Sequence, residues 1–348
     1  MKKRTFLQAI LATGSVGLLT ARYLQPQKSA SLPLQPTTLP DEPVPSILPE
    51  FADSTPQEEF ELVMLQENEL HPAFRHNERE SGTKEQIQEL VEQLPEETVD
   101  SYLEKIRNFD ADFLTDIYLS EKNSLLLLPT LARLERVQNF VGHANFNLLG
   151  FEEMLYFARN YEDIGAFEKA ELEFIDEIFH ADATAYGFFG TKITPDLNHR
   201  ISSRDVAKIN GSGHYLLKGE SLNHYDQIRR DVGNQLLLTS GIRNNVKQMH
   251  LFLAKAFQSD GNLSKAPRSL APPGHSYHNA GDFDVGKIGL GAMNFTADFS
   301  HTPEFERLIS LGYVDIRCTD TNQYGVRYEP WHIKLGCSSE HGSSCDHA

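Results

Sequence analysis

Two short stretches near the C-terminal end place histidines and carboxylates at spacings that suit a metal-dependent hydrolase. Residues 273–284 include His278, and residues 329–332 include Glu329 and His332. A catalytic zinc ion keeps three protein ligands from His, Asp, Glu or Cys and leaves a fourth position for water. The two stretches can supply three such ligands and a further carboxylate that acts as a base. They therefore predict a hydrolytic zinc site.

Three motifs that follow one another along the chain give this site a family resemblance. They are Ser240-Gly241-Ile242-Arg243 with Gln248 five residues after the Arg, Ser276-x-His278-x-x-Gly281 with a following Asp, and Glu329-x-Trp331-His332. Together they resemble the signatures of the zinc D-alanyl-D-alanine carboxypeptidases of the VanY type, which are LAS metallopeptidases. The resemblance does not cover the helical region that precedes the motifs.

The resemblance implies a role for each matched residue. The zinc ligands would be His278, Asp284 and His332. Glu329 would be the catalytic carboxylate, and Arg243 would steady the developing oxyanion or the substrate carbonyl. The chemistry of the side chains agrees, because zinc lowers the pKa of bound water to about 7. A neighbouring carboxylate can then take the water proton and pass it to the leaving amine.

The carboxylate ligand is the one position at which the chain departs from the family. The family has Ser-x-His-x-x-Gly-x-Ala-x-Asp, whereas here Gly281 is followed directly by Asp282-Phe283-Asp284, one residue shorter. Asp284 is favoured because it precedes Val285, as the family's Asp precedes an apolar residue. In a regular strand Asp282 and Asp284 share a face, so either carboxylate could reach the metal.

Four further residues are candidates for substrate binding. Gln248 follows from the resemblance. Ser276 also shapes the loop of the first histidine, and Trp331 would form a packing wall beside the site. Arg268, in Ala266-Pro267-Arg268-Ser269-Leu270, could meet a substrate carboxylate, and a solvated loop arginine is an equal alternative.

The elements that must position these residues predict an α+β fold, with a small antiparallel sheet and flanking helices as in LAS metallopeptidases, preceded by an acidic all-helical region. Helical periodicity marks residues 87–94, 125–141, 151–160 and 166–180. Beyond residue 190 the pattern predicts strands at 214–217, 235–239, 283–285, 313–317 and 325–335, and a helix at 245–257. Tyr328-x-Pro330 implies an edge position or a bend just before the second histidine.

Composition divides the chain into five segments. We expect a signal peptide or anchor at residues 1–24, a Pro-rich linker at 25–56, the helical region at 57–190, the zinc peptidase domain at 191–337 and a disordered tail at 338–348. The first segment has a basic start followed by an apolar run, which is typical of an export signal. Its Lys3-Arg4-x-Phe6-Leu7 order resembles a twin-arginine signal with Lys for the first Arg, so the general secretory route stays open.

Charge and cysteine content exclude some partners and leave others open. A net charge of -17 argues against nucleic acid, which is bound through Lys and Arg. No stretch beyond the N-terminal one reaches the about 18 to 20 apolar residues of a membrane span, so we expect no stable span besides a short N-terminal anchor. Cys318 could pair with Cys337 or Cys345, or all three could be free thiols.

The sequence therefore predicts an exported zinc D-alanyl-D-alanine carboxypeptidase of the periplasm or cell envelope, by resemblance, acting on peptidoglycan stem peptides through a zinc-activated water. An L-Ala-D-Glu or cross-bridge endopeptidase of the same fold is one alternative, since bond choice depends on pocket walls outside the motifs. A non-catalytic binding protein of the cell envelope is another. The base Glu329 argues against it.

Overall fold

The computed structural model describes residues 99–314 and 318–335, and its elements define an α+β fold. The helices are α4 (Val99–Arg107), α5 (Glu121–Val141), α6 (His143–Phe146), α7 (Phe151–Asn160), α8 (Lys169–His180), α9 (Glu220–Val232), α10 (Asn245–Gln258) and α11 (Pro303–Ser310). The strands are β1 (Val206–Ile209), β2 (His214–Leu217), β3 (Leu236–Ser240), β4 (Phe283–Lys287) and β5 (His332–Ile333). Short 3₁₀ turns lie at Ala183–Tyr186, Ala266–Arg268, Tyr277–Asn279, Gly291–Phe295 and Ala297–His301.

The long helix α5 begins at a side-chain cap and buries one stripe. The Ser120 hydroxyl accepts a hydrogen bond from the backbone N–H of Asn123, which satisfies one of the unpaired donors at the start of the helix. Leu127, Leu131 and Leu134 follow one another at helical spacing and are buried. Truncation of the almost fully buried Leu134 to Ala would cost about 2–5 kcal/mol of stability.

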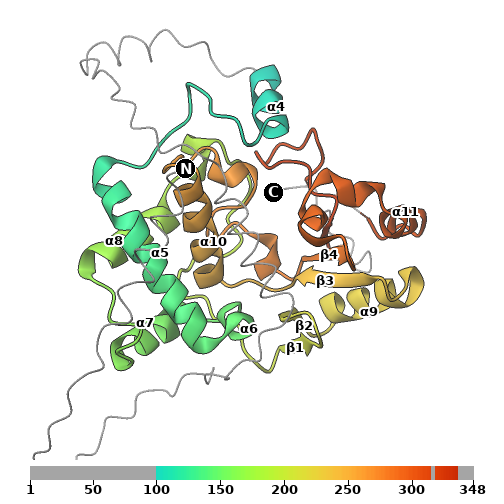
Figure 1. The fold of residues 1–348 in the computed structure, drawn as a ribbon, viewed down its shortest axis with the longest axis horizontal. Coiled ribbons are helices and arrows are strands. Elements are labelled where there is room, and N and C mark those ends of the chain that lie inside the picture. The colour runs from blue at the N-terminus through green and yellow to red at the C-terminus, as the bar shows by residue number, and fades with distance from the viewer. Residues whose placement is uncertain (1–98, 315–317, 336–348) are drawn as a thin grey trace, which may run out of the picture. The chain divides into compact units, whose positions relative to one another are not determined.

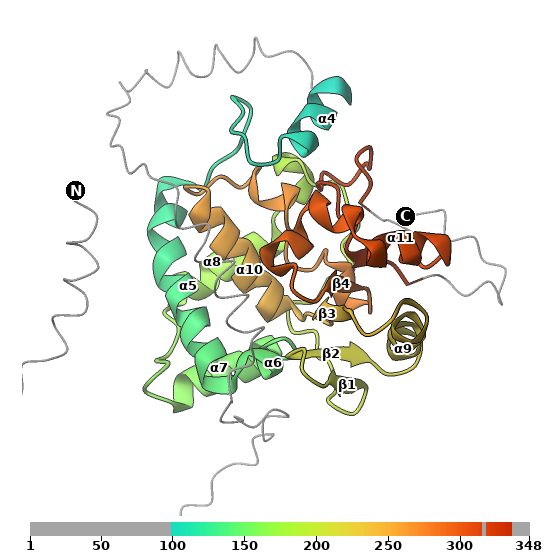
Figure 2. The same cartoon turned by 45° about the vertical axis from the view of Figure 1, so that its right-hand side comes forward.

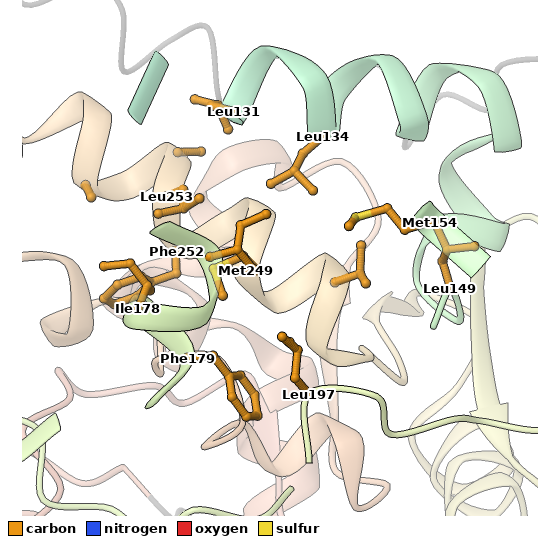
Figure 3. Close-up of a cluster of buried hydrophobic side chains, with 14 of the residues drawn as sticks. Leu131, Leu134, Leu149, Met154, Ile178, Phe179, Leu197, Met249, Phe252 and Leu253 are labelled. Atoms are coloured by element: carbon orange, nitrogen blue, oxygen red, sulfur yellow. The ribbon is translucent and has the colours of Figure 1, made fainter. Parts of the chain in front are cut away.

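Helix α10 lies between the helical layer of α5, α7 and α8 and the sheet of β3 and β4 (Figures 1 and 2). Its Met249, Phe252 and Leu253 pack in one buried cluster with side chains of α5 and α8, as Figure 3 shows. The cluster joins residues on both sides of position 190. The boundary predicted there therefore does not separate two hydrophobic cores.

The three-stranded sheet has the order β3-β4-β5 with antiparallel neighbours. Its apolar side chains form a second cluster with those of α9 and α11, including Leu238, Phe283, Val285 and Ile333. Strands β1 and β2 form a separate antiparallel hairpin. The predicted class, a small antiparallel sheet with flanking helices, is confirmed.

Most of the predicted elements are present, and one strand is much shorter than predicted. The helices predicted at 125–141, 151–160, 166–180 and 245–257 correspond to α5, α7, α8 and α10, and three of the strands to β2, β3 and β4. The strand predicted at 325–335 is too long, because only His332 and Ile333, which form β5, pair with β4. Pro330 has no N–H for a ladder, and the chain turns there before entering the sheet as an edge strand, in agreement with the predicted bend.

Several predictions fall on residues outside the described ranges. These are the segments 1–24, 25–56 and 338–348, the helix at 87–94, and Cys337 and Cys345 as partners of Cys318; the strand at 313–317 falls there in part. Among the residues that the structure does describe, no helix combines the length and the apolar character needed to span a membrane.

Candidate metal centre

The three predicted ligands meet at the edge of the sheet. His278, Asp284 and His332 each offer one ligand atom, and these atoms lie within 4.8 Å of one another. The register of the sheet explains part of this, since Asp284 of β4 is paired with His332 of β5. Side chains paired across antiparallel strands project to the same face, so the ladder brings a carboxylate and an imidazole together.

His278 reaches the site from a 3₁₀ turn, and the Ser-Gly-Ile-Arg motif fixes its ring. Its Nδ1 lies 2.7 Å from the carbonyl oxygen of Gly241 and donates to it, which leaves Nε2 as the ligand atom. A Cβ at Gly241 would lie 2.1 Å from the carbonyl oxygen of Tyr215. Glycine is therefore required where β2 approaches the end of β3, and this approach places the carbonyl that orients His278.

The two carboxylates predicted to share a face contact different nitrogens of His332. Asp284 Oδ1 lies 3.0 Å from Nδ1 of His332, and Asp284 Oδ2 lies 3.3 Å from Nε2 of His278. Asp282 Oδ2 lies 3.0 Å from Nε2 of His332, and its other oxygen accepts a hydrogen bond from the backbone N–H of Leu335. Asp284 therefore contacts both imidazoles, while Asp282 contacts the other nitrogen of His332 and orients that ring.

The acid–base state of the cluster follows from burial and from these contacts. Burial alone lowers the pKa of His332, but hydrogen bonds to Asp282 and Asp284 raise this pKa to about 10. Burial alone would raise the pKa of Asp284, yet His278 and His332 hold it well below its ordinary value. Burial and the charge of Arg243 lower the pKa of His278, so its ring is neutral near pH 7. A neutral imidazole beside an ionised carboxylate is the donor set that zinc prefers.

A cavity of about 240 Å³ opens beside these three residues. Glu329 and Arg243 both line it, together with the three candidate ligands. Burial raises the pKa of Glu329, which moves this carboxyl toward the range useful for proton transfer near neutral pH. Arg243 follows the end of β3 and precedes Asn244, the capping residue of α10, so two regular elements hold its backbone.

Of the four candidates for substrate binding, two line the cavity and two do not. Ser276 and Trp331 lie in its wall. Gln248 does not line it, since its side-chain amide donates instead to the carbonyl of Ala271 at 2.5 Å. The prediction for Arg268 is wrong: its guanidinium forms a buried ion pair with Asp116 and donates to the carbonyl of Ala111. The Gln248 amide and the Arg268 guanidinium therefore bind loop segments of the protein itself.

The cavity also has residues that the motifs did not indicate. Lys255 and Arg327 add two cationic side chains, and Phe188 and Gly190 bring part of the predicted helical region into the wall. A signal for Lys255 exists in the sequence. Leu251, Lys255 and Gln258 are spaced at i, i+4 and i+7, which places them on one face of α10, and all three line the cavity.

The α+β domain therefore gathers two histidines, an aspartate and a buried glutamate around one cavity, the residues that the resemblance to VanY-type peptidases implies. Residues 220–336 match the family model described as VanY: D-alanyl-D-alanine carboxypeptidase. This match covers the segment that holds the three motifs, and it confirms their resemblance to the VanY family. No curated protein is a match for the chain.

Two solved structures show a weak likeness to the chain. One is a mutant of the vancomycin resistance D,D-pentapeptidase VanY from a VanB-type resistance cassette in complex with Zn(II), at 21% identity with a TM-score of 0.29. The match covers 38% of this chain and 78% of the chain in that structure. The second is VanYB in complex with D-alanine-D-alanine, at 21% identity with a TM-score of 0.30, covering 38% of this chain and 77% of the other.

Proposed function

We propose that the chain is a zinc-dependent carboxypeptidase that removes the terminal D-alanine from peptidoglycan stem peptides. The observation that carries the proposal is the meeting of His278, Asp284 and His332 beside a cavity that Glu329 and Arg243 also line. The family match supports the choice of substrate.

The donor atoms present in the chain fit zinc. The hydrogen bond from Nδ1 of His278 to Gly241 leaves Nε2 available, and the contact with Asp282 leaves Nδ1 of His332 facing Asp284. Two imidazole nitrogens and a carboxylate oxygen would hold the ion and leave a position open. When bound, zinc polarises a water molecule and the carbonyl under attack.

The remaining chemistry belongs to the side chains of the cavity. The Glu329 carboxylate would take the proton of the attacking water and deliver it to the nitrogen of the departing D-alanine. The Arg243 guanidinium would stabilise negative charge on the carbonyl oxygen, an effect worth about 3 kcal/mol for a well-placed donor. Trp331, with an exposed fraction of 3%, closes one wall and excludes water from that side.

The test is the release of D-alanine from a pentapeptide stem ending in two D-alanines. The zinc-loaded protein should release free D-alanine, a chelator should stop the release, and added zinc should restore it. Mass spectrometry of the products distinguishes the alternatives, because cleavage between L-Ala and D-Glu or within a cross-bridge yields different fragments. A zinc-loaded, folded sample that cleaves none of these peptides would identify a binding protein and overturn the proposal.

We also propose that the protein is exported to the cell envelope. The basic residues at positions 2–4 and the apolar run that follows support this location, as does the nature of the substrate. Cell fractionation should find the full-length protein outside the cytoplasm. A variant lacking residues 1–24 should stay in the cytoplasm, and equal export of both forms would refute this location.

A further inference from the structure

Two cations line the cavity without a part in the proposed chemistry. Lys255 lies in the last turn of α10, and Arg327 lies in the loop that precedes Glu329. Buried or half-buried cations in a cavity are expected to pair with anions, because an uncompensated charge away from water is costly. The groups around each cation show whether it already has a strong partner within the protein.

Two aromatic rings and a backbone carbonyl hold the guanidinium of Arg327 in place, and part of this group has no hydrogen-bond partner. The group lies over the ring of Phe109 at 4.5 Å and over the ring of Trp331 at 5.1 Å. Its Nη2 donates to the carbonyl of Phe295 at 3.0 Å, while its buried Nε has no hydrogen-bond partner among the described residues. Two aromatic contacts and one hydrogen bond fix the plane of the guanidinium, which lines the cavity.

Lys255 has only a weak partner. Its Nζ lies 3.5 Å from Asp110, whose side chain is 66% exposed. Pairs with an exposed partner contribute little to stability, so an incoming carboxylate can replace Asp110. Arg268 is the contrasting case, because its partner Asp116 is fully buried and the pair is part of the protein interior.

The position of Lys255 separates it from the reaction centre. Arg243 stands just before α10. From the first residue of the helix, Asn245, to Lys255 in its last turn is about 15 Å along the axis at 1.5 Å per residue. An extended peptide advances about 3.3–3.6 Å per residue, so roughly two to four residues fill the gap once the reach of the side chains is allowed for. A carboxypeptidase leaves one residue beyond the scissile bond. The remaining substrate lies on its amino side.

We propose that Lys255 and Arg327 form a carboxylate-binding subsite, here called the cation subsite, which recognises an acidic group of the peptide on the amino side of the scissile bond. The inference rests on the proposed peptidase function and adds the substrate feature that the cavity selects. A planar guanidinium and an ammonium suit a carboxylate, the former through paired N–H donors and the latter as a point charge.

The test compares three forms of one peptide, L-Ala-γ-D-Glu-L-Lys-D-Ala-D-Ala. The second form has the free glutamyl carboxylate replaced by an amide, and the third has the terminal carboxylate replaced by an amide. The unaltered protein should cleave the acid about tenfold or more better than the glutamyl amide, as expected for a hydrogen bond between charged groups. Lys255→Gln should abolish this preference by raising KM for the acid, with kcat unchanged. Arg327→Lys, which keeps the charge, should retain part of the preference for the acid over the glutamyl amide.

Lys265→Gln is the matched control. Lys265 also pairs with an exposed aspartate of the preceding segment, Asp112 at 3.3 Å, but it does not line the cavity. Equal cleavage of the acid and the glutamyl amide by the unaltered protein would overturn the inference, as would equal effects of Lys255→Gln and Lys265→Gln. Loss of selectivity for the terminal carboxylate alone in Lys255→Gln would overturn the assignment to the amino side.

Binding separates this inference from the proposed function. Calorimetry on the zinc-loaded Glu329→Gln protein should show about tenfold weaker binding of the glutamyl amide than of the acid. Adding Lys255→Gln should remove that difference. If no peptide is cleaved but the difference in binding is present, the peptidase proposal fails and the subsite stands. Equal affinities of the Glu329→Gln protein for the acid and the glutamyl amide would overturn the cation subsite, whether or not the peptides are cleaved.

Discussion

The two parts of the cavity wall differ in how firmly their charged groups are held. At the metal centre, each ring nitrogen of His278 and His332 has a partner within 3.3 Å, and all the groups involved are buried. In the cation subsite, Lys255 has one exposed partner at 3.5 Å, and Arg327 keeps an unpaired nitrogen. The imidazoles of the metal centre are therefore fully paired within the fold, whereas the cations of the cation subsite are not.

This difference follows from what each part must do. Catalysis requires donors that need no rearrangement at the moment of reaction, so rigid positioning at the metal centre is an advantage. Recognition requires only that the substrate bind better than the group it displaces. We therefore expect large effects from small changes at the metal centre and modest effects from changes at the cation subsite.

The largest effect should come from Glu329→Gln. The amide keeps the size of the side chain but cannot accept the water proton, and general acid–base catalysis contributes about 10²–10⁴-fold. Release of D-alanine should fall by a factor in that range while zinc content stays at the unaltered level. Glu173→Gln, which changes an exposed glutamate of α8, is the control. Turnover near the unaltered value in Glu329→Gln would show that another group is the base.

Asp282→Asn should have the next largest effect, on zinc affinity. Asp282 fixes His332 from the side away from Asp284, and loss of such a supporting contact costs about 10–100-fold in metal affinity. Competition with a chromogenic chelator measures the dissociation constant. Asp176→Asn removes a comparable aspartate–histidine contact from the surface, with His180, and should change nothing. Unaltered affinity in Asp282→Asn would mean that the sheet alone orients His332.

The pH dependence of zinc binding should reflect the protonation of His332. In the metal-free protein its pKa is raised to about 10, so the proton stabilises that folded form fully below pH 6.5. This stabilisation is lost as pH rises through about 10. Zinc binding must release the proton, and affinity should therefore rise up to about tenfold per pH unit between pH 7 and 9.

Calorimetry in buffers of different ionisation enthalpy should count about one released proton at pH 7.5. Asp282→Asn removes one of the two carboxylates that raise the pKa of His332, so its pH slope should be shallower. An affinity that does not change with pH, after correction for the chelator, would contradict the protonated state of this ring.

The sequence predicted the metal centre better than it predicted the rest of the cavity. The resemblance of the motifs indicated His278, Asp284 and His332, and strand periodicity indicated that Asp282 shares the face of Asp284. The different contacts of the two aspartates depend on the pairing of β4 with β5, which no local pattern specifies.

Arg268 and Arg327 show why the remaining residues could not be assigned. Both are arginines near the motifs, and only the packing of the segment from Phe109 to Asp116 decides between them. That segment buries Asp116 against Arg268 and lays Phe109 over Arg327. Contacts between positions so far apart in the chain arise from the fold as a whole, so the sequence alone could not show that Arg268 is paired in the interior while Arg327 lines the cavity.

The smallest effect should come from Asp110→Asn, which tests whether the cation subsite is open to exchange. Removal of this carboxylate frees Lys255 from a competitor worth less than about 1 kcal/mol, so KM for the acidic peptide should fall by about two- to fourfold. The KM for the glutamyl amide should not change. Asp112→Asn, which affects the contacts with Lys265 and Asn262 outside the cavity, should leave both values as they are.

A higher KM for the acid in Asp110→Asn would reverse this interpretation. Asp110 would then hold Lys255 in the orientation that the substrate needs, and the cation subsite would be positioned in advance like the metal centre. High salt provides a second measure, because screening weakens an exposed pair more than a buried one. The advantage of Asp110→Asn should therefore shrink as salt rises, whereas the defect of Glu329→Gln should not.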